Sequence, residues 1–155
     1  AHVDVLVGNE EDLQKGLGIP GPDVTAKSAL DSGAFLAMID RVVARYPQIQ
    51  VLATTLREVR STNRHTWSAV AWIGGKAYVA PACELDVHDR VGGGDAFVGG
   101  LIYGLKTYGD NLQKALDFAV AASCLKHSIV GDFNMVTVEE AEKIMSGDVS
   151  GRVSR

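Results

Sequence analysis

Residues 89–100 read DRVGGGDAFVGG, in which three consecutive glycines are followed at once by an acid, Asp95. The apolar residues after these glycines recur at helical spacing, which predicts a helix from near Gly93 to about Tyr108. The glycines at 92–94 leave three backbone N–H groups bare at this helix start, where they lack intrahelical partners and the helix dipole favours an anion. The turn therefore predicts an anion hole for a phosphoryl group, beside a carboxylate that can accept a hydroxyl proton.

A flexible turn with Asp95 as a helix cap is the competing interpretation of the same residues, and a bare Gly-Gly-Gly-Asp does not separate the two. The helix that follows favours the anion hole. It contains Gly99, Gly100 and Gly104, each of which destabilises a helix interior by about 1 kcal/mol relative to Ala. Such a helix is expected to pack very closely against backbone or against a ligand.

The rest of the chain alternates strand and helix patterns. This order predicts a layered α/β domain with a largely parallel sheet and an antiparallel hairpin, because two apolar runs flank Gly74-Gly75. The expected elements of the first part are a strand over 3–7, an acidic helical turn over 10–12, a loop over 16–22, a helix over 35–46 ended by Pro47, and a strand over 51–54. They are followed by hairpin strands over 66–73 and 76–80 and by a helix from Asp110 or Asn111 to His127, with Gln113 in a capping box. A Thr137–Glu140 capping box opens the last helix, and the tail over 147–155 is expected to fray.

Composition narrows the function classes. The 155 residues carry a net charge of −4, which argues against a general nucleic-acid surface because such a surface needs a basic stripe. The two cysteines, Cys83 and Cys124, stand in unrelated contexts and form no CxxC pair, so we expect two buried free thiols and no zinc site. No signal peptide or membrane-length apolar run is visible, which favours a cytoplasmic protein without a membrane partner.

The 89–100 segment resembles the second signature of the ribokinase-like (PfkB) carbohydrate kinases, Asp-Thr-x-Gly-Ala-Gly-Asp-x-Phe. Arg90 stands where Thr is usual, so a cation replaces a hydroxyl, and Gly93 stands where Ala is usual. The resemblance implies a ribokinase-like α/β/α fold, with ATP and Mg²⁺ as cofactors and Asp95 as the catalytic base. It also implies that the anion hole is formed by Gly92, Gly93 and Gly94.

Residues 9–12 are similar to a second element of that family, Asn-x-x-Glu, which helps to position magnesium and phosphates. The similarity implies a nucleotide contact from Asn9 and an indirect magnesium contact from Glu11 or from Asp12, which stands where Glu is usual. A capped acidic helix turn explains these residues locally just as well.

Weaker nucleotide contacts are implied at three other places. Thr55 and Arg57 occupy the position of a family turn that follows a strand close to the nucleotide. Ser123 ends a stripe of small residues that predicts tight helix packing, and in the family this helix edges the adenine pocket. Asn134 lies in a loop that the resemblance brings near the nucleotide.

The loop over 131–134 resembles that of the 2-keto-3-deoxygluconate kinase branch, in which an Asp near this place can contact the sugar acid; the candidate here is Asp132. The resemblance thus implies a kinase that converts ATP and 2-keto-3-deoxygluconate to ADP and the 6-phosphate. Two alternatives stay open: a PfkB kinase of another sugar or a nucleoside, and a non-catalytic nucleotide-binding module. The retention of Asp95 beside intact glycines argues against the module.

The resemblance covers essentially the whole chain but only the C-terminal half of the family. Residues 1–155 are therefore expected to be the nucleotide-binding, catalytic part, without the N-terminal sugar-binding half and its lid. The implied partners are a small-molecule sugar acid and ATP, and the full-length enzyme is expected to be a homo-oligomer. Without the lid, the isolated chain is expected to have little or no kinase activity, and absent sheet neighbours predict exposed apolar surface.

Overall fold

The computed structural model describes residues 2–9, 11–21 and 32–147. Glu10, the end of the loop expected over 16–22, and most of the tail expected to fray lie outside the described residues. The elements in chain order are β1 (Val5–Asn9), α1 (Asp12–Leu17), α2 (Ser32–Arg45), β2 (Val51–Val59), β3 (Arg64–Ile73), β4 (Lys76–Val79), β5 (Cys83–Asp86), α3 (Gly93–Thr107), α4 (Leu112–Lys126) and α5 (Val138–Met145).

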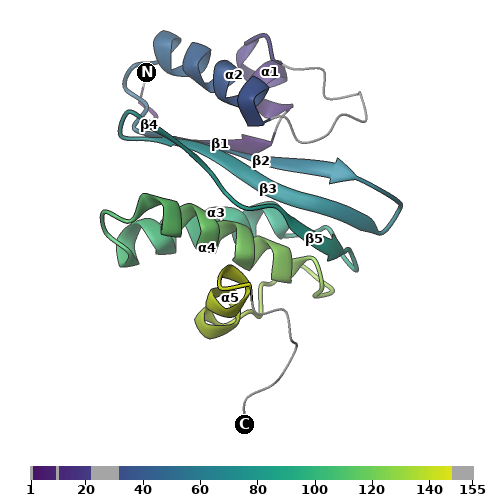
Figure 1. The fold of residues 1–155 in the computed structure, drawn as a ribbon. Helices are drawn as coiled ribbons and strands as arrows, with labels where there is room; N and C mark the ends of the chain where they lie inside the picture. The colour runs from purple at the N-terminus through teal and green to yellow at the C-terminus, as the bar shows by residue number, and fades with distance from the viewer. Residues whose placement is uncertain (1, 10, 22–31, 148–155) are drawn as a thin grey trace.

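The elements form layers, as the sequence predicted (Figure 1). Helices α1 and α2 cover one face of the sheet, α3 and α4 cover the other, and α5 packs on α4 away from the sheet. Each sheet face buries its own apolar cluster. The α2 face is centred on Met38, Ile39, Val42, Leu52 and Val70, and the α3–α4 face on Ala53, Ala69, Phe97, Leu101 and Leu116.

The sheet is mixed, whereas the sequence predicted a largely parallel one. Its order is β1-β2-β3-β4, with β5 paired to β3. The β1–β2 pairing is parallel, because α2 carries the chain back between the two strands, and the pairings of β3 with β2, β4 and β5 are antiparallel. The β3–β4 hairpin was predicted correctly: Gly74 and Gly75 have φ angles of 57° and 90°, which glycine adopts without strain.

Strand β2 is longer than predicted, and this changes the setting of two candidate site residues. Its antiparallel register with β3 runs from Val51 opposite Ile73 to Val59 opposite His65. Thr55 and Arg57 therefore lie within the strand and not in a turn after it.

Strand β5 was not predicted, and β1 begins and ends two residues later than expected, at Val5–Asn9.

Helices α3 and α4 pack against each other through glycine. A Cβ atom on Gly100 would lie 2.9 Å from the Cα of Ala119, and one on Gly104 would lie 2.7 Å from the Cα of Ala115. The expected close packing is confirmed at these two glycines. Gly99 has no atom of this kind within 4 Å, because it faces a cavity.

The predicted helix caps are confirmed at two of three points. The Thr137–Glu140 capping box is present at α5. Asn111 caps α4, but its side chain accepts from the backbone N–H of Lys114. Gln113 is not part of a capping box, because its amide donates instead to the Val79 carbonyl and the Asp117 carboxylate.

The two cysteines are neighbours, contrary to their separate sequence contexts. Cys124 is buried in α4 and Cys83 is half-buried in β5. A hydrogen bond between the two side chains lowers the pKa of Cys83 and, together with burial, raises the pKa of Cys124. Among the residues that the structure describes, no helix has the length and apolar character needed to cross a membrane.

Candidate active site

The glycine turn opens α3 as predicted. Gly92 is the N-terminal cap, with a φ angle of 76°, and the helix begins at Gly93. A Cβ atom on Gly92 would lie 2.2 Å from the backbone oxygen of Asp132, so glycine is required both by the backbone angle and by the neighbouring loop. Asp95 lies in the first turn and makes no capping hydrogen bond, which disfavours the interpretation of this residue as a structural cap.

The last turns of α4 support the glycine turn from below. The Ser123 hydroxyl donates to the Gly93 carbonyl at 2.7 Å, and the Ser123 carbonyl lies 2.7 Å from Nδ1 of His127. The His127 ring packs so closely that a Cβ atom on Gly93 would lie 2.6 Å from its Cε1 atom. Ser123 was predicted as a nucleotide contact, and its position corrects that prediction: the side chain is fully buried and holds the turn.

Asp89 joins the glycine turn to the loop that precedes α5. Its carboxylate accepts from the backbone N–H of Val91 at 3.0 Å and from that of Gly131 at 2.8 Å. These amides hold the pKa of Asp89 below its ordinary value. Lys126 is fully buried beside this link and donates to the Ile129 carbonyl at 3.0 Å. The first acid of the signature is thus a structural tie between two loops.

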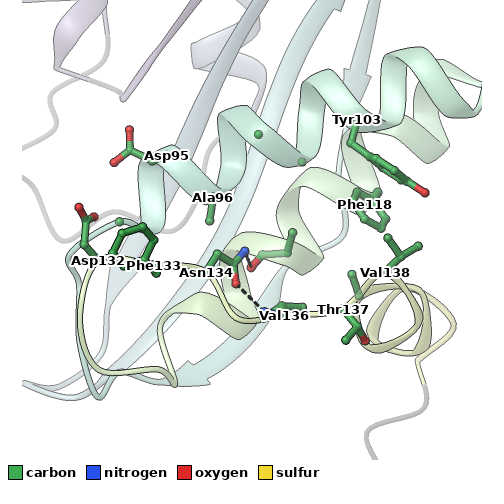
Figure 2. Close-up of a pocket in the computed structure, with 15 residues that line it drawn as sticks. Asp95, Ala96, Tyr103, Phe118, Asp132, Phe133, Asn134, Val136, Thr137 and Val138 are labelled. Carbon is green, nitrogen blue, oxygen red and sulfur yellow. Dashed lines mark hydrogen bonds between the residues drawn. The ribbon is translucent and has the colours of Figure 1, made fainter.

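A cavity of about 610 Å³ lies between α3, α4, α5 and this loop. Figure 2 shows that its two ends differ in character. Asp95 and Asp132 lie at one end, and Tyr103, Phe118 and Val138 lie at the other. Small residues on the facing helices, among them Gly99 and Ala122, leave room between these ends. The first cavity is therefore acidic at one end and apolar at the other.

Four predicted residues line this first cavity: Gly92, Asp95, Asp132 and Asn134. Asp95 is exposed, and its side chain projects from the first turn of α3 (Figure 2). Asn134 is held in place because its side-chain oxygen accepts from the Val136 N–H at 3.1 Å. The carboxylate, the loop acid and the amide predicted from separate segments therefore share one cavity.

A second cavity, of about 460 Å³, lies on the other side of the glycine turn, where Gly94 forms part of its wall. It brings together the remaining candidates from the end of β1, the start of α1 and the middle of β2. Its polar lining consists of Asn9, Glu11, Asp12, Thr55, Arg57 and Arg90, with Trp67 and Phe97 among its apolar residues. The glycine turn is therefore shared between an apolar cavity with an acidic end and a cavity rich in charged side chains.

The Asn9–Asp12 turn is organised by its own residues. The Asn9 side-chain oxygen accepts from the N–H groups of Glu11 at 2.8 Å and Asp12 at 3.1 Å, and Asp12 accepts from the Asn9 N–H at 2.8 Å. Glu11 forms an ion pair with Lys15 one turn further on. The capped acidic turn, one of the two interpretations from sequence, is present, and the same residues line the second cavity.

Sequence reasoning missed the supporting residues Lys126 and His127. Both stand at the end of α4, and each is buried against the site. Burial lowers the pKa of His127, which keeps its ring neutral beneath the glycines. A polar pair at the end of an apolar helix, directly before a glycine loop, was the signal available in the sequence.

Comparison with known proteins agrees with this geometry. A 2-dehydro-3-deoxygalactonokinase of Haloferax volcanii is 32% identical over 96% of this chain and 40% of its own length. The crystal structure of 2-dehydro-3-deoxygluconokinase from Thermotoga maritima superimposes with a TM-score of 0.81 and 40% identity, over 93% of this chain and 41% of that one. A candidate ribokinase II from E. coli, solved in complex with ATP and Mg²⁺, shares the fold at a TM-score of 0.60 and 15% identity, over 93% of this chain and 39% of that one.

This chain therefore spans about 40% of the length of the curated relatives that it matches. A family model described as pfkB family carbohydrate kinase matches residues 1–136, which include the glycine turn, Asp95 and both cavities except the α5 wall. The resemblance seen in the signature is thus confirmed over most of the chain, and the protein belongs to the pfkB family of carbohydrate kinases.

Proposed function

We propose that this chain is the nucleotide-binding and catalytic part of a sugar-acid kinase that uses ATP and Mg²⁺. The observation that carries the proposal is the position of Asp95, one residue beyond the bare glycine turn and on the wall of the first cavity. A carboxylate there can reach a hydroxyl brought to the phosphoryl group that the turn binds.

The chemistry follows from this arrangement. Asp95 accepts the proton of the substrate hydroxyl as its oxygen forms a bond to the γ-phosphorus of ATP. The bond from that phosphorus to the bridging oxygen breaks, and ADP leaves with the electron pair. Amides of Gly92, Gly93 and Gly94 at the start of α3 stabilise the charge on the transferring group, with the helix dipole aligned to help them. The Gly93 N–H, which donates to the Arg90 carbonyl at 3.4 Å, would exchange this long hydrogen bond for a phosphoryl oxygen. The apolar end of the first cavity suits the adenine base.

Magnesium fits the oxygen-rich wall of the second cavity. Carboxylate and amide oxygens are the ligands that this hard cation prefers, and Glu11, Asp12 and Asn9 supply them. Because these groups already accept hydrogen bonds or form an ion pair with neighbouring residues, they suit contacts through the ion's water shell. Bound magnesium would neutralise charge on the nucleotide phosphates.

The proposed acceptor is 2-keto-3-deoxygluconate or a close sugar acid. The support is the similarity to kinases named for such substrates, together with the loop acid, Asp132, at the same end of the cavity as Asp95. Phosphorylation assays with a panel of sugar acids, sugars and nucleosides on the complete kinase that contains this segment test the choice. Faster turnover of ribose, fructose or a nucleoside would replace the sugar acid as substrate.

The role of Asp95 is tested by Asp95→Asn in the same complete kinase. We expect turnover to fall by about a hundredfold or more, since a general base contributes 10²–10⁴-fold, while nucleotide affinity stays unchanged. Ordinary turnover by this variant would remove Asp95 as the base. Asp110→Asn, which alters an exposed acid at the far end of α3, is the matched control and should turn over normally.

A further inference from the structure

Two arginines from distant parts of the sequence meet at the second cavity. Arg57 lies in β2 directly opposite Trp67 of β3, and Arg90 immediately precedes the glycine turn. Both line the cavity of about 460 Å³, together with Gly94 of that turn. Arg90 thus places a cation beside the predicted anion hole at the position where related signatures carry a hydroxyl.

These two arginines are not neutralised by the acids of the same cavity. Glu11 forms its ion pair with Lys15, and Asp12 accepts from the Asn9 N–H. Among the described residues, neither Arg57 nor Arg90 takes part in an ion pair or a side-chain hydrogen bond. The next arginines of the β2–β3 hairpin differ in this respect, because they pair with nearby acids: Arg60 with Glu58, and Arg64 with Asp86.

The backbone around Arg90 is held firmly. Its neighbours Asp89 and Val91 are joined by the hydrogen bond from the Val91 N–H to the Asp89 carboxylate. The Asp89 N–H donates in turn to the His127 carbonyl at 3.1 Å, and the Arg90 carbonyl accepts from Gly93 at 3.4 Å. The base of the side chain is therefore anchored relative to the glycine turn, whereas the guanidinium is free to reach into the cavity.

One residue that lines the cavity carries an unsatisfied donor. Trp67 lines it and is 8% exposed, and its indole N–H has no acceptor among the described residues. A buried N–H without a partner destabilises a protein unless a water, an ion or a ligand supplies an acceptor. An oxyanion in the cavity supplies acceptors for both guanidinium groups.

We propose that Arg90, together with Arg57, binds the outer phosphates of the nucleotide in this second cavity, next to Gly94. The inference rests on the proposed nucleotide site and adds the residues that recognise its charged end. Guanidinium groups bind phosphate oxygens through paired N–H donors. Phosphate is favoured over the carboxylate of a sugar acid because the Asn9–Asp12 turn, with its magnesium-type oxygens, lines the same cavity.

The test measures binding to the complete kinase that contains this segment by calorimetry, with four ligands: Mg²⁺·ATP, adenosine, Mg²⁺·tripolyphosphate and 2-keto-3-deoxygluconate. Arg90→Gln should weaken ATP and tripolyphosphate by about tenfold to a hundredfold, the range for a hydrogen-bonded charge, and leave adenosine unchanged. The affinity of Arg90→Lys for ATP and tripolyphosphate should lie between those of Arg90→Gln and the unaltered protein, because lysine keeps the charge and lacks the paired donors. Arg41→Gln on the exposed side of α2 is the control for lost charge.

Three results would overturn the inference. The first is equal tripolyphosphate affinity for Arg90→Gln and the unaltered kinase, and the second is no tripolyphosphate binding by the unaltered kinase. The third is that Arg90→Gln weakens binding of the sugar acid alone. The last result would make Arg90 a carboxylate receptor. Because Arg90→Lys preserves the cation, it keeps the test decisive if Arg90→Gln fails to fold. The proposed kinase function is judged separately by the Asp95→Asn turnover assay, so each can fail without the other.

Discussion

The glycine turn and the Asn9–Asp12 turn border the same cavity but are held in opposite ways. The glycine turn depends on partners far along the chain: Ser123, His127 and the loop at Asp132. The Asn9–Asp12 turn closes on itself through hydrogen bonds between residues two or three apart. The conformation of the glycine turn therefore depends on tertiary packing, whereas the Asn9–Asp12 turn is held by contacts between residues close in sequence.

The two turns are therefore expected to respond differently to substitution. A change beneath the glycine turn alters both the fold and the anion hole, because the same contacts maintain the two. A change in the Asn9–Asp12 turn removes local hydrogen bonds and leaves the α3–α4 packing intact. Substitutions in the two turns should therefore show these two behaviours separately.

The largest effect is expected at Gly92. Gly92→Ala combines a left-handed backbone angle with a contact of 2.2 Å to the Asp132 carbonyl, so the free energy of unfolding should fall by about 3 kcal/mol or more. Gly94→Ala is the matched variant, because its Cβ meets nothing within 4 Å, and it should be as stable as the unaltered chain or more so. Denaturant unfolding of both measures the contrast. Equal losses would show that Asp132 does not restrict the turn.

An intermediate, pH-dependent effect is expected at His127. Burial lowers its pKa, so below its ordinary pKa of about 6.5 the unfolded chain binds a proton that the folded chain rejects. The free energy of unfolding should therefore decline as pH falls through that value, by at most about 1.4 kcal/mol per pH unit.

His127→Gln should flatten this decline while remaining folded at pH 7.5, and His88→Gln, at an exposed position, should not. Denaturant titrations at several pH values between 7.5 and 5.5 give the slopes. An identical slope in His127→Gln would assign the acid sensitivity to other groups.

The smallest effect is expected at Asn9. Asn9→Ala removes the acceptor for the N–H groups of Glu11 and Asp12, which should reduce stability by about 1 kcal/mol. Hydrogen exchange should quicken in α1 and remain unchanged at the amides of Gly93 to Phe97. Faster exchange at the glycine turn would mean that the two turns are coupled, and the contrast between them would not hold.

The elements that sequence predicted well are those determined by short-range patterns. The Thr137–Glu140 capping box, the Gly74–Gly75 turn and the helix that starts at Gly93 each depend on residues within a few positions. The length of β2, the existence of β5 and the mixed sheet depend on which strands pair with β3, and this pairing is not visible in any single segment.

The candidate site divides in the same manner. The glycines and Asp95 could be identified because bare amides followed by an acid have a local physical meaning. Ser123 was assigned the wrong role, and Lys126 and His127 were passed over, because their function comes from packing α4 against a turn thirty residues away from Ser123. Long-range support of this kind becomes visible only when the helices are placed.

In the proposed mechanism, the start of α3 receives the transferring phosphoryl group beside Asp95. The most direct measurement is a crystal structure of the kinase that contains this segment, bound to Mg²⁺ and a non-hydrolysable ATP analogue. We predict the terminal phosphate within hydrogen-bonding distance of the amides of residues 92–94, the Asp95 carboxylate facing it, and the base at the Tyr103–Phe118 end of the first cavity. A terminal phosphate bound elsewhere, with Asp95 turned into solvent, would contradict the account.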